Sequence, residues 1–181
     1  MTDAPVLPID WTIAVEAVPE KGGPWTATAT EAERKAVADA LNLVTLGALG
    51  FTGRIERRAD GRYRITGHVK ADLEQPCVVT LDPVAARIDE AVDVEFRPEQ
   101  LKADANAVDV DLDSGPDIEP IVRGRLEIGR VVFETLSAGL DPYPRRAGEA
   151  IDEMVAAPRG AEPVARANPF AVLADFKAKK T

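Results

Sequence analysis

The sequence predicts an α+β fold: an antiparallel meander sheet of about five strands packed on one long amphipathic helix, with short helices near the N-terminus and at the C-terminus. Three observations support this prediction. Apolar residues recur at helical spacing over 118–138, apolar and polar residues alternate in several earlier stretches, and turn-forming pairs such as Asp60-Gly61 separate those stretches. With 181 residues, 45% of them hydrophobic, the chain can bury a core of its own.

The long helix is the strongest element of the prediction. Its apolar face consists of Ile118, Ile121, Val122, Leu126, Ile128, Val132, Phe133, Leu136 and Leu140. Asp117 is the expected N-cap, and Gly139 followed by Asp-Pro-Tyr-Pro is the expected end. Within this face Gly129 would let another backbone approach closely. Arg125 should reach the edge of the face, pair with a carboxylate or contact a partner.

The N-terminal part of the chain is expected to hold a strand and a short helix. Residues 7–18 alternate between apolar and polar side chains, which predicts a first strand ending at the prolines and glycines that follow. Thr30 and Glu33 have the spacing of a capping box, and alanine-rich apolar positions follow at helical spacing. A short helix is therefore predicted over 30–42.

Four further extended stretches complete the predicted sheet. They cover 44–57, 62–73, 77–81 and 88–96. In the first of these, Gly47, Gly50 and Gly53 suggest bends or bulges. The Asp60-Gly61 pair predicts a hairpin turn between the first stretch and the second.

The composition changes after the predicted sheet. Residues 98–117 lose apolar density and are acidic, which indicates a loop leading into the long helix. We therefore expect a single domain over 1–144, a flexible linker over 145–167 and a C-terminal amphipathic helix over 168–181. The apolar side of that last helix should dock either on the domain, which we favour, or on a partner, because an apolar face left in water is unfavourable.

Charge, cysteine content and hydropathy argue against several function classes. The net charge of −9, from 22 basic and 31 acidic residues, argues against binding nucleic acid over the whole surface, because the long-range field repels phosphates. One cysteine, Cys77, and one histidine, His68, cannot build a disulfide framework or a Cys/His zinc site. The N-terminus lacks signal-peptide features and the long helix carries too many charges to span a membrane, so we expect a cytoplasmic, soluble protein with no membrane partner.

The candidate catalytic and metal-binding residues favour a non-enzymatic protein. His68 lies on the outer side of a predicted strand, and no serine or cysteine has the surroundings of a nucleophile. Asp109, Asp111 and Asp113 alternate along the acidic stretch, which is more typical of a solvated strand face than of a metal site, since the calcium-loop pattern is incomplete. We therefore expect no catalytic residue, metal, cofactor or small-molecule substrate.

One segment has a positive balance. The predicted hairpin over 54–70 contains six lysines and arginines against Glu56 and Asp60, and alternation places a basic row on one side of its second strand. Such a row suits phosphate contacts to structured RNA, although a solvated outer face of an antiparallel sheet would look the same. The candidate RNA-binding residues are Arg54, Arg57, Arg58, Arg62, Arg64, His68 and Lys70.

The order of several motifs resembles that of a known family. The motifs are a strand ending in Cys77, the Leu81-Asp-Pro-Val84 segment, the acidic Val108-Asp-Val-Asp-Leu112 segment, a long helix ending in Leu140-Asp-Pro-Tyr-Pro-Arg145, and Asn168-Pro-Phe-Ala-Val-Leu173. In this order the chain resembles the YceD-like family of large ribosomal RNA subunit accumulation proteins over roughly residues 5–180. Many relatives carry a Cys-x-x-Cys pair, but here the second position is Thr80, so the paired-cysteine chemistry is lost and Cys77 is expected to be a buried thiol.

The resemblance implies a role in accumulation or processing of the large-subunit ribosomal RNA during ribosome assembly. The implied partner is that RNA or a ribosomal protein. Two forms of this function remain open. In the first, the basic hairpin contacts RNA directly. In the second, the protein is an acidic adaptor in which Asp109, Asp111 and Asp113 bind a basic ribosomal protein without RNA contact.

Overall fold

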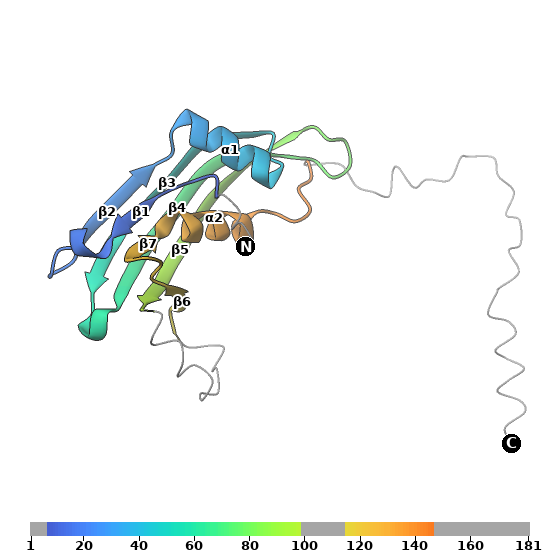
Figure 1. Ribbon diagram of the computed structural model, residues 1–181. Coiled ribbons are helices and arrows are strands. Elements are labelled where there is room, and N and C mark those ends of the chain that lie inside the picture. Colours follow the sequence, from blue (N-terminus) through green and yellow to red (C-terminus); the bar gives the residue numbers. More distant parts are fainter. Residues whose placement is uncertain (1–6, 99–114, 147–181) are drawn as a thin grey trace, which may run out of the picture. The chain divides into compact units, whose positions relative to one another are not determined.

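The computed structural model describes residues 7–98 and 115–146, which belong to one compact unit, Met1–Arg146. This described part contains seven strands in two sheets and two α-helices (Figure 1). In chain order the elements are β1 (Thr12–Ala14), η1 (Val15–Ala17), β2 (Gly23–Thr28), α1 (Glu31–Leu41), β3 (Thr45–Arg57), η2 (Ala59–Gly61), β4 (Tyr63–Pro76), β5 (Pro83–Arg97), β6 (Asp117–Pro120), β7 (Arg125–Glu127) and α2 (Ile128–Gly139).

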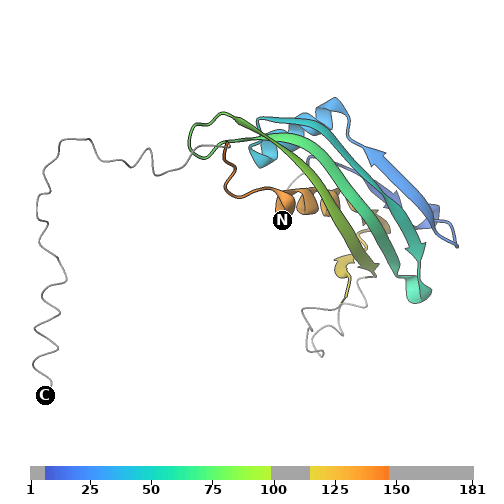
Figure 2. The same cartoon turned by 180° about the vertical axis from the view of Figure 1, so that it is seen from behind.

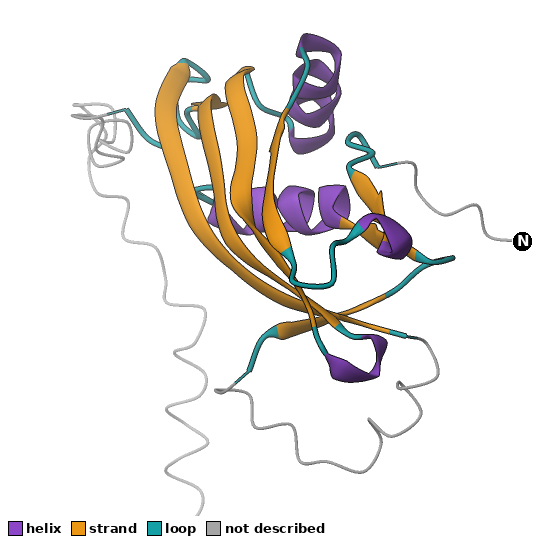
Figure 3. Ribbon diagram, turned by 90° about the vertical axis from the view of Figure 1, so that its left-hand side faces the viewer, coloured by secondary structure: helices purple, strands orange, loops and turns teal. Residues whose placement is uncertain are grey.

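The larger sheet has five strands in the order β2-β3-β4-β5-β6. The first four are antiparallel neighbours, whereas β6 runs parallel to β5 and pairs only with its last four residues, from Val94 to Arg97. The sheet is curved, and α1, α2 and the small β1–β7 sheet lie on its concave side (Figure 3). No helix of the described part covers the convex face. Figure 2, the view from behind relative to Figure 1, shows this face.

The concave face carries the core. Phe51 lies at its centre and is only 1% exposed, with Trp25 packed against it at a ring-centroid distance of 5.6 Å. Gly53 and Gly67 stand opposite each other on β3 and β4, and a Cβ on Gly67 would come within 2.7 Å of Cζ of Phe51. Because neither glycine carries a side chain, the Phe51 ring can lie flat over this part of the sheet. The core is completed from α2 by residues such as Val132 and Leu136.

Several local predictions are confirmed. Thr30 and Glu33 form the capping box of α1, in which the backbone N–H of Thr30 donates to the Glu33 carboxylate at 2.8 Å. The hairpin turn forms at η2, where Asp60 adopts a left-handed conformation with φ of 68°. The register of β3 against β4 shifts between Leu46 and Ala48, so an irregularity does occur at Gly47.

The predicted fold class is wrong. In the described residues there is no long amphipathic helix, and the chain is mainly sheet. The segment predicted as one helix over 118–138 forms β6, a tight turn, β7 and the 12-residue helix α2. The turn is the physical reason, since Arg123 and Gly124 have φ of 49° and 72°, which no right-handed helix permits, and Val122 and Arg125 exchange backbone hydrogen bonds across it.

This correction explains the two residues that interrupted the predicted apolar face. Arg125 lies on β7 beside the buried Leu126, so strand alternation turns its guanidinium outward, where it donates to the hydroxyl of Thr12. Gly129 does allow the close backbone approach expected of it. Its N–H donates to the carbonyl of Trp11 at 2.8 Å, and a Cβ there would stand 2.6 Å from the carbonyl oxygen of Ile9.

Two predicted strands also need correction. The first, over 7–18, shrinks to the three residues of β1, because its only partner in the described part is the equally short β7. The one over 77–81 is the turn between β4 and β5, in which Leu81 has φ of 64° and donates its N–H to the carbonyl of Cys77 at 2.9 Å. The larger sheet still has five strands, because β2, which was not predicted, and β6 take the places of the two incorrect strands.

The predicted domain boundaries remain predictions. The proposed linker over 145–167 and the helix over 168–181 lie, apart from the first two residues of the linker, outside the described residues. The predicted acidic loop over 98–117 also lies mostly outside them.

Candidate functional site

The basic residues predicted to bind RNA lie on the β3–β4 hairpin. Within β4 the alternation is as expected: Tyr63 and Ile65 are buried on the concave side, and Arg64 and His68 face the convex side. Arg57 has the opposite parity, because it pairs with Tyr63, but it lies at the end of the strand and is exposed. Arg54, Arg64, His68 and Lys70 therefore share the convex face, while Arg57, Arg58 and Arg62 lie at the hairpin end.

In the middle of this face the cations are balanced by carboxylates from β5. The guanidinium of Arg64 makes two hydrogen bonds to Asp93, at 2.7 and 2.6 Å. Asp89 accepts from both Nδ1 of His68, at 2.8 Å, and Nζ of Lys70, at 3.1 Å. A further pair joins the two strands in the reverse sense, because Arg87 on β5 donates to Asp72 on β4 at 2.7 Å.

These contacts stabilise the charged form of the carboxylates. A hydrogen bond from Arg64 is the main cause that lowers the pKa of Asp93, and hydrogen bonds from Lys70 and then His68 lower the pKa of Asp89. Both aspartates therefore remain ionised at neutral pH. A phosphate approaching the middle of the face would meet these negative charges beside each cation, which opposes its binding.

At the hairpin end the balance is different, because pairs of arginines share one carboxylate. Arg54 and Arg58 both approach Glu56, at 3.9 and 3.0 Å. Arg57 is exposed and makes no ion pair with any residue that the structure describes. The Arg58 backbone N–H donates to the carbonyl of Arg62 at 2.8 Å, which closes the turn and holds the cluster together.

A second shared carboxylate lies where β4 meets β5. Glu95 is 8% exposed and contacts Arg97 at 2.6 Å and Arg62 at 3.4 Å, while Arg62 also reaches Asp60 at 3.1 Å. Burial is the largest single effect and raises the pKa of Glu95, but hydrogen bonds and positive charge from Arg97 and Arg62 together outweigh it and the pKa is lowered. We call the following residues the hairpin-end cluster: Arg54, Arg57, Arg58, Arg62 and Arg97, with Glu56, Asp60 and Glu95.

The residues that sequence reasoning missed are the acidic partners on β5. Asp89, Asp93 and Glu95 alternate along β5, and that pattern alone predicts that they share one face. Their position beside the basic row of β4 depends on the register of the two strands, in which Lys70 pairs with Asp89 and Arg64 with Glu95. No local sequence pattern specifies that register over so long a hairpin.

Cys77 is buried, as predicted. Hydrogen bonds from the Thr80 hydroxyl and then from the backbone N–H groups of Thr80, Val79 and Arg146 lower the pKa of its thiol. Thr80 thus uses its hydroxyl at the position where many relatives carry a second cysteine. In the described ranges, no three histidine, cysteine or acidic side chains are placed to hold a metal ion.

Other predicted features lie beyond the described residues or concern membranes. Asp109, Asp111 and Asp113 are outside residues 7–98 and 115–146, so the proposed acidic partner site stays a prediction. None of the helices that the structure describes has the length and hydropathy needed to cross a lipid bilayer.

Comparison with known proteins identifies the family. Residues 65–177 match the family model described as "Large ribosomal RNA subunit accumulation protein YceD". The match spans β4 from Ile65 onward and all the later elements, whereas Arg54, Arg57, Arg58 and Arg62 precede it. Comparisons with curated proteins and with solved structures gave no match.

The family is described as an accumulation factor and not as an enzyme, and its name relates it to the large ribosomal subunit. Because the matched residues make up more than half of the chain, this protein belongs to the YceD family.

Proposed function

We propose that the protein is a non-enzymatic cytoplasmic factor in biogenesis of the large ribosomal subunit, and that its hairpin-end cluster contacts phosphates of the large-subunit ribosomal RNA. The family name supports the first half of this proposal. The observation that carries the second half is the unequal sharing of carboxylates: Arg54 and Arg58 share Glu56, and Arg57 beside them has no ionic partner in the described part.

Arginine is suited to this role for a physical reason. Its guanidinium offers several N–H groups in one plane and can donate two of them to a phosphate, while keeping its charge at any physiological pH. Arg54 and Arg58 are about half exposed, at 53% and 44%, so they can turn from Glu56 towards a phosphate without leaving a buried carboxylate unpaired. Arg62 is less able to turn towards a phosphate, because it also forms an ion pair with the nearly buried Glu95.

The middle of the convex face is a weaker candidate for RNA contact. Arg64 is held by two hydrogen bonds to Asp93, and the carboxylate would be left beside the incoming phosphate if Arg64 moved away. The same holds for Lys70 and Asp89. Phosphate contacts should therefore concentrate at the hairpin end.

The experiment compares two triple variants that remove the same number of positive charges. One replaces Arg54, Arg57 and Arg58 with glutamine, and the other replaces Arg64, Lys70 and Arg87 with glutamine. Affinity for transcripts of large-subunit ribosomal RNA is measured over a series of salt concentrations. Because the change in net charge is equal, any difference between the variants comes from local contacts.

We expect the hairpin-end variant to bind the RNA at least about tenfold more weakly, and the slope of its salt dependence to decrease by about one unit for each phosphate that it no longer neutralises. The control variant should stay within about twofold of the wild type. In cells, the hairpin-end variant should accumulate unprocessed large-subunit RNA and the control should not. Equal reductions in affinity in the two variants, or unchanged RNA binding in both, would contradict direct contact by the hairpin end.

The adaptor alternative needs a separate surface for a basic protein. Its predicted residues, Asp109, Asp111 and Asp113, lie outside the described part. An acidic groove within the described part supplies another candidate, and it does not depend on the RNA contact proposed for the hairpin end.

A further inference from the structure

The strand β5 has an unpaired edge. Along one side it pairs with β4 from Pro83 to Phe96, but along the other side β6 covers only the end from Val94 to Arg97. From Pro83 to Asp93 no strand of the described part lies beside that second edge. An uncovered edge presents backbone N–H and C=O groups that can pair with another extended chain.

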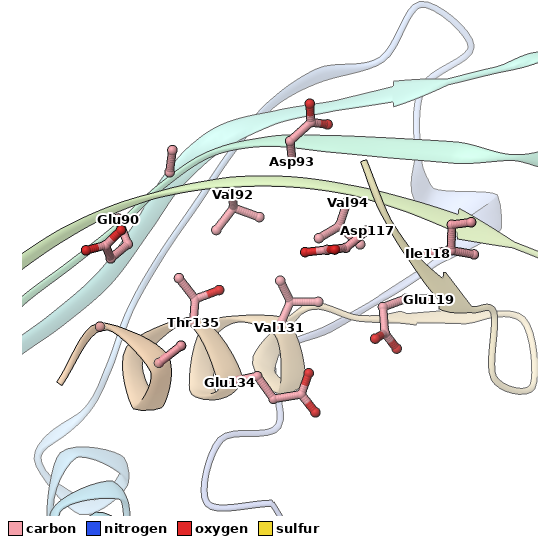
Figure 4. Close-up of a pocket in the computed structure, with 13 residues that line it drawn as sticks. Glu90, Val92, Asp93, Val94, Asp117, Ile118, Glu119, Val131, Glu134 and Thr135 are labelled. Carbon is pink, nitrogen blue, oxygen red and sulfur yellow. The ribbon is translucent and has the colours of Figure 1, made fainter. Parts of the chain in front are cut away.

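A groove runs beside this edge, between β5, β6 and α2. Its volume is about 560 Å³, and Figure 4 shows the side chains that line it. Val92 and Val94 from β5 and Val131 from α2 form an apolar floor, and Thr135 stands beside them. The groove is therefore able to accept alternate side chains of a chain that lies along the β5 edge.

The walls of the groove are acidic. Carboxylates from all three elements line it, namely Glu90, Asp93, Asp117, Glu119 and Glu134, and none of the lining residues is a lysine or arginine. Arg130 contacts Glu134 at 2.9 Å and Glu119 at 3.8 Å, and Arg64 holds Asp93 from the convex side. Glu90 and Asp117 make no ion pair with any described residue, so the groove keeps a negative balance.

The spacing of these carboxylates favours an extended ligand over a metal ion. They are distributed along β5, β6 and α2, and in the described residues no three acidic or histidine groups converge as metal ligands do. RNA is disfavoured because its phosphates would be repelled. A second copy of this chain is also disfavoured, because pairing two β5 edges would bring Asp89, Glu90 and Asp93 against the same residues.

We propose that an extended basic segment of a partner protein adds to the open edge of β5 between Ile88 and Asp93. Its backbone pairs with β5, and every second side chain points into the groove on the concave side. These groove-facing side chains are basic where they meet Glu90 and Asp117 and apolar where they contact Val92 and Val131. Backbone pairing supplies affinity, while the acidic walls and apolar floor select a sequence in which basic and apolar residues lie two positions apart and so share one face of the added strand.

The first test uses the full chain and a labelled nine-residue peptide, Lys-Thr-Val-Thr-Lys-Thr-Val-Thr-Lys, in which lysine and valine share one face of the extended strand. Its affinity is compared with that of the same peptide carrying N-methyl groups on alternate residues, which removes backbone donors and keeps the charge. We expect the N-methylated peptide to bind at least about tenfold more weakly, since strand addition needs those donors. We also expect the peptide to slow amide exchange between Ile88 and Asp93. Equal binding of the two peptides would overturn the proposal, because charge alone would then explain it.

The second test locates the site with matched charge reversals. One variant carries Glu90→Lys and Asp117→Lys, and the control carries Glu16→Lys and Glu20→Lys, two exposed residues away from the groove. The groove variant should bind the peptide at least about tenfold more weakly, and the affinity of the control should fall much less. Equal reductions in affinity would overturn the proposal, as would sedimentation showing that the wild-type chain dimerises through this edge.

Peptide binding and RNA binding can fail independently. The triple variant at Arg54, Arg57 and Arg58 should keep its affinity for the peptide, and the groove variant should keep its affinity for RNA at the hairpin end. Weaker peptide binding in the hairpin variant would place the peptide elsewhere and overturn the assignment to β5.

Discussion

The concave and convex faces of the five-stranded sheet are built from neighbouring residues of the same strands, yet they have different roles. On β3 the buried Phe51 is followed by the exposed Thr52, and on β4 the buried Ile65 follows Arg64, which is paired with Asp93. The concave face gains stability from apolar burial, whereas the convex face exchanges ionic contacts in water, which contribute little. Stability and charge pattern are therefore carried by alternate positions and can be changed separately.

The largest effect should come from opening the concave face. Phe51→Ala removes a ring that is 1% exposed and leaves a cavity against Trp25, so we expect the free energy of unfolding to fall by about 3–5 kcal/mol. The neighbouring Thr52→Ala on the convex face should change it by less than about 0.5 kcal/mol. Chemical denaturation of the two variants measures the difference. Similar destabilisation at both positions would show that the convex face also carries stability.

A smaller effect should follow from filling space on the concave face. In Gly67→Ala the new Cβ would lie 2.5 Å from the carbonyl oxygen of Thr52, 2.6 Å from Cα of Gly53 and 2.7 Å from Cζ of Phe51, so both the β3 backbone and the ring must move. Overpacking of this kind costs about 1–3 kcal/mol. Gly23→Ala is the matched control, because nothing lies within 4 Å of its Cβ position. Thermal unfolding should rank the two variants in that order, and a stable Gly67→Ala protein would mean that Phe51 does not rest on the glycine pair.

Glu33 should be an exception to this separation of roles, because it lies on α1, on the concave side, and yet stabilises the fold through its charge. The Glu33 carboxylate accepts from the backbone N–H of Thr30 and from Nε1 of Trp11, and the Thr30 contact is the main cause that lowers its pKa. Because the pKa of Glu33 is lower in the folded than in the unfolded protein, its ionised carboxylate stabilises the fold above the unfolded pKa, about 4.3. This stabilisation is lost as pH falls through the folded pKa.

Glu33→Gln should therefore cost about 1 kcal/mol at neutral pH and less at acidic pH. Urea denaturation at neutral pH and near pH 3 measures both values. Lys35→Gln on the exposed side of α1 serves as the control. Destabilisation that is the same at both pH values would mean that the Glu33 charge has no part in the cap.

The smallest change in stability is expected at the convex pair. Asp93→Asn removes the carboxylate that holds Arg64, and both side chains are substantially exposed, so the midpoint of unfolding should hardly move. If carboxylates do prevent phosphate contact in the middle of this face, the variant should bind ribosomal RNA more tightly and with a steeper salt dependence. Glu74→Gln, on the same face and further along β4, is the control for the change in net charge. Equal increases in RNA affinity would make the effect one of net charge alone.

The features that could be predicted from the sequence are those whose interacting residues lie close together along the chain. Thr30 and Glu33 are three residues apart, and the Asp60-Gly61 turn joins adjacent strands, so both were predictable. The long helix was not, because Ile118 and Ile121 fit a helical spacing as well as they fit β6 followed by a turn. The Arg123-Gly124 pair was the available sign of a break, since glycine favours the left-handed conformation that this turn requires.

The same distinction applies to the candidate site. Which side chains of β4 share a face could be read from the sequence, because strand alternation is a property of adjacent residues. Which cations are neutralised depends on the fold, since the positions of Asp89, Asp93 and Glu95 beside them follow from the register of β5. Tertiary pairing likewise made strands of 117–120 and 125–127, because the end of β5 and the short β1 offered backbone partners there, and it left the rest of the β5 edge open.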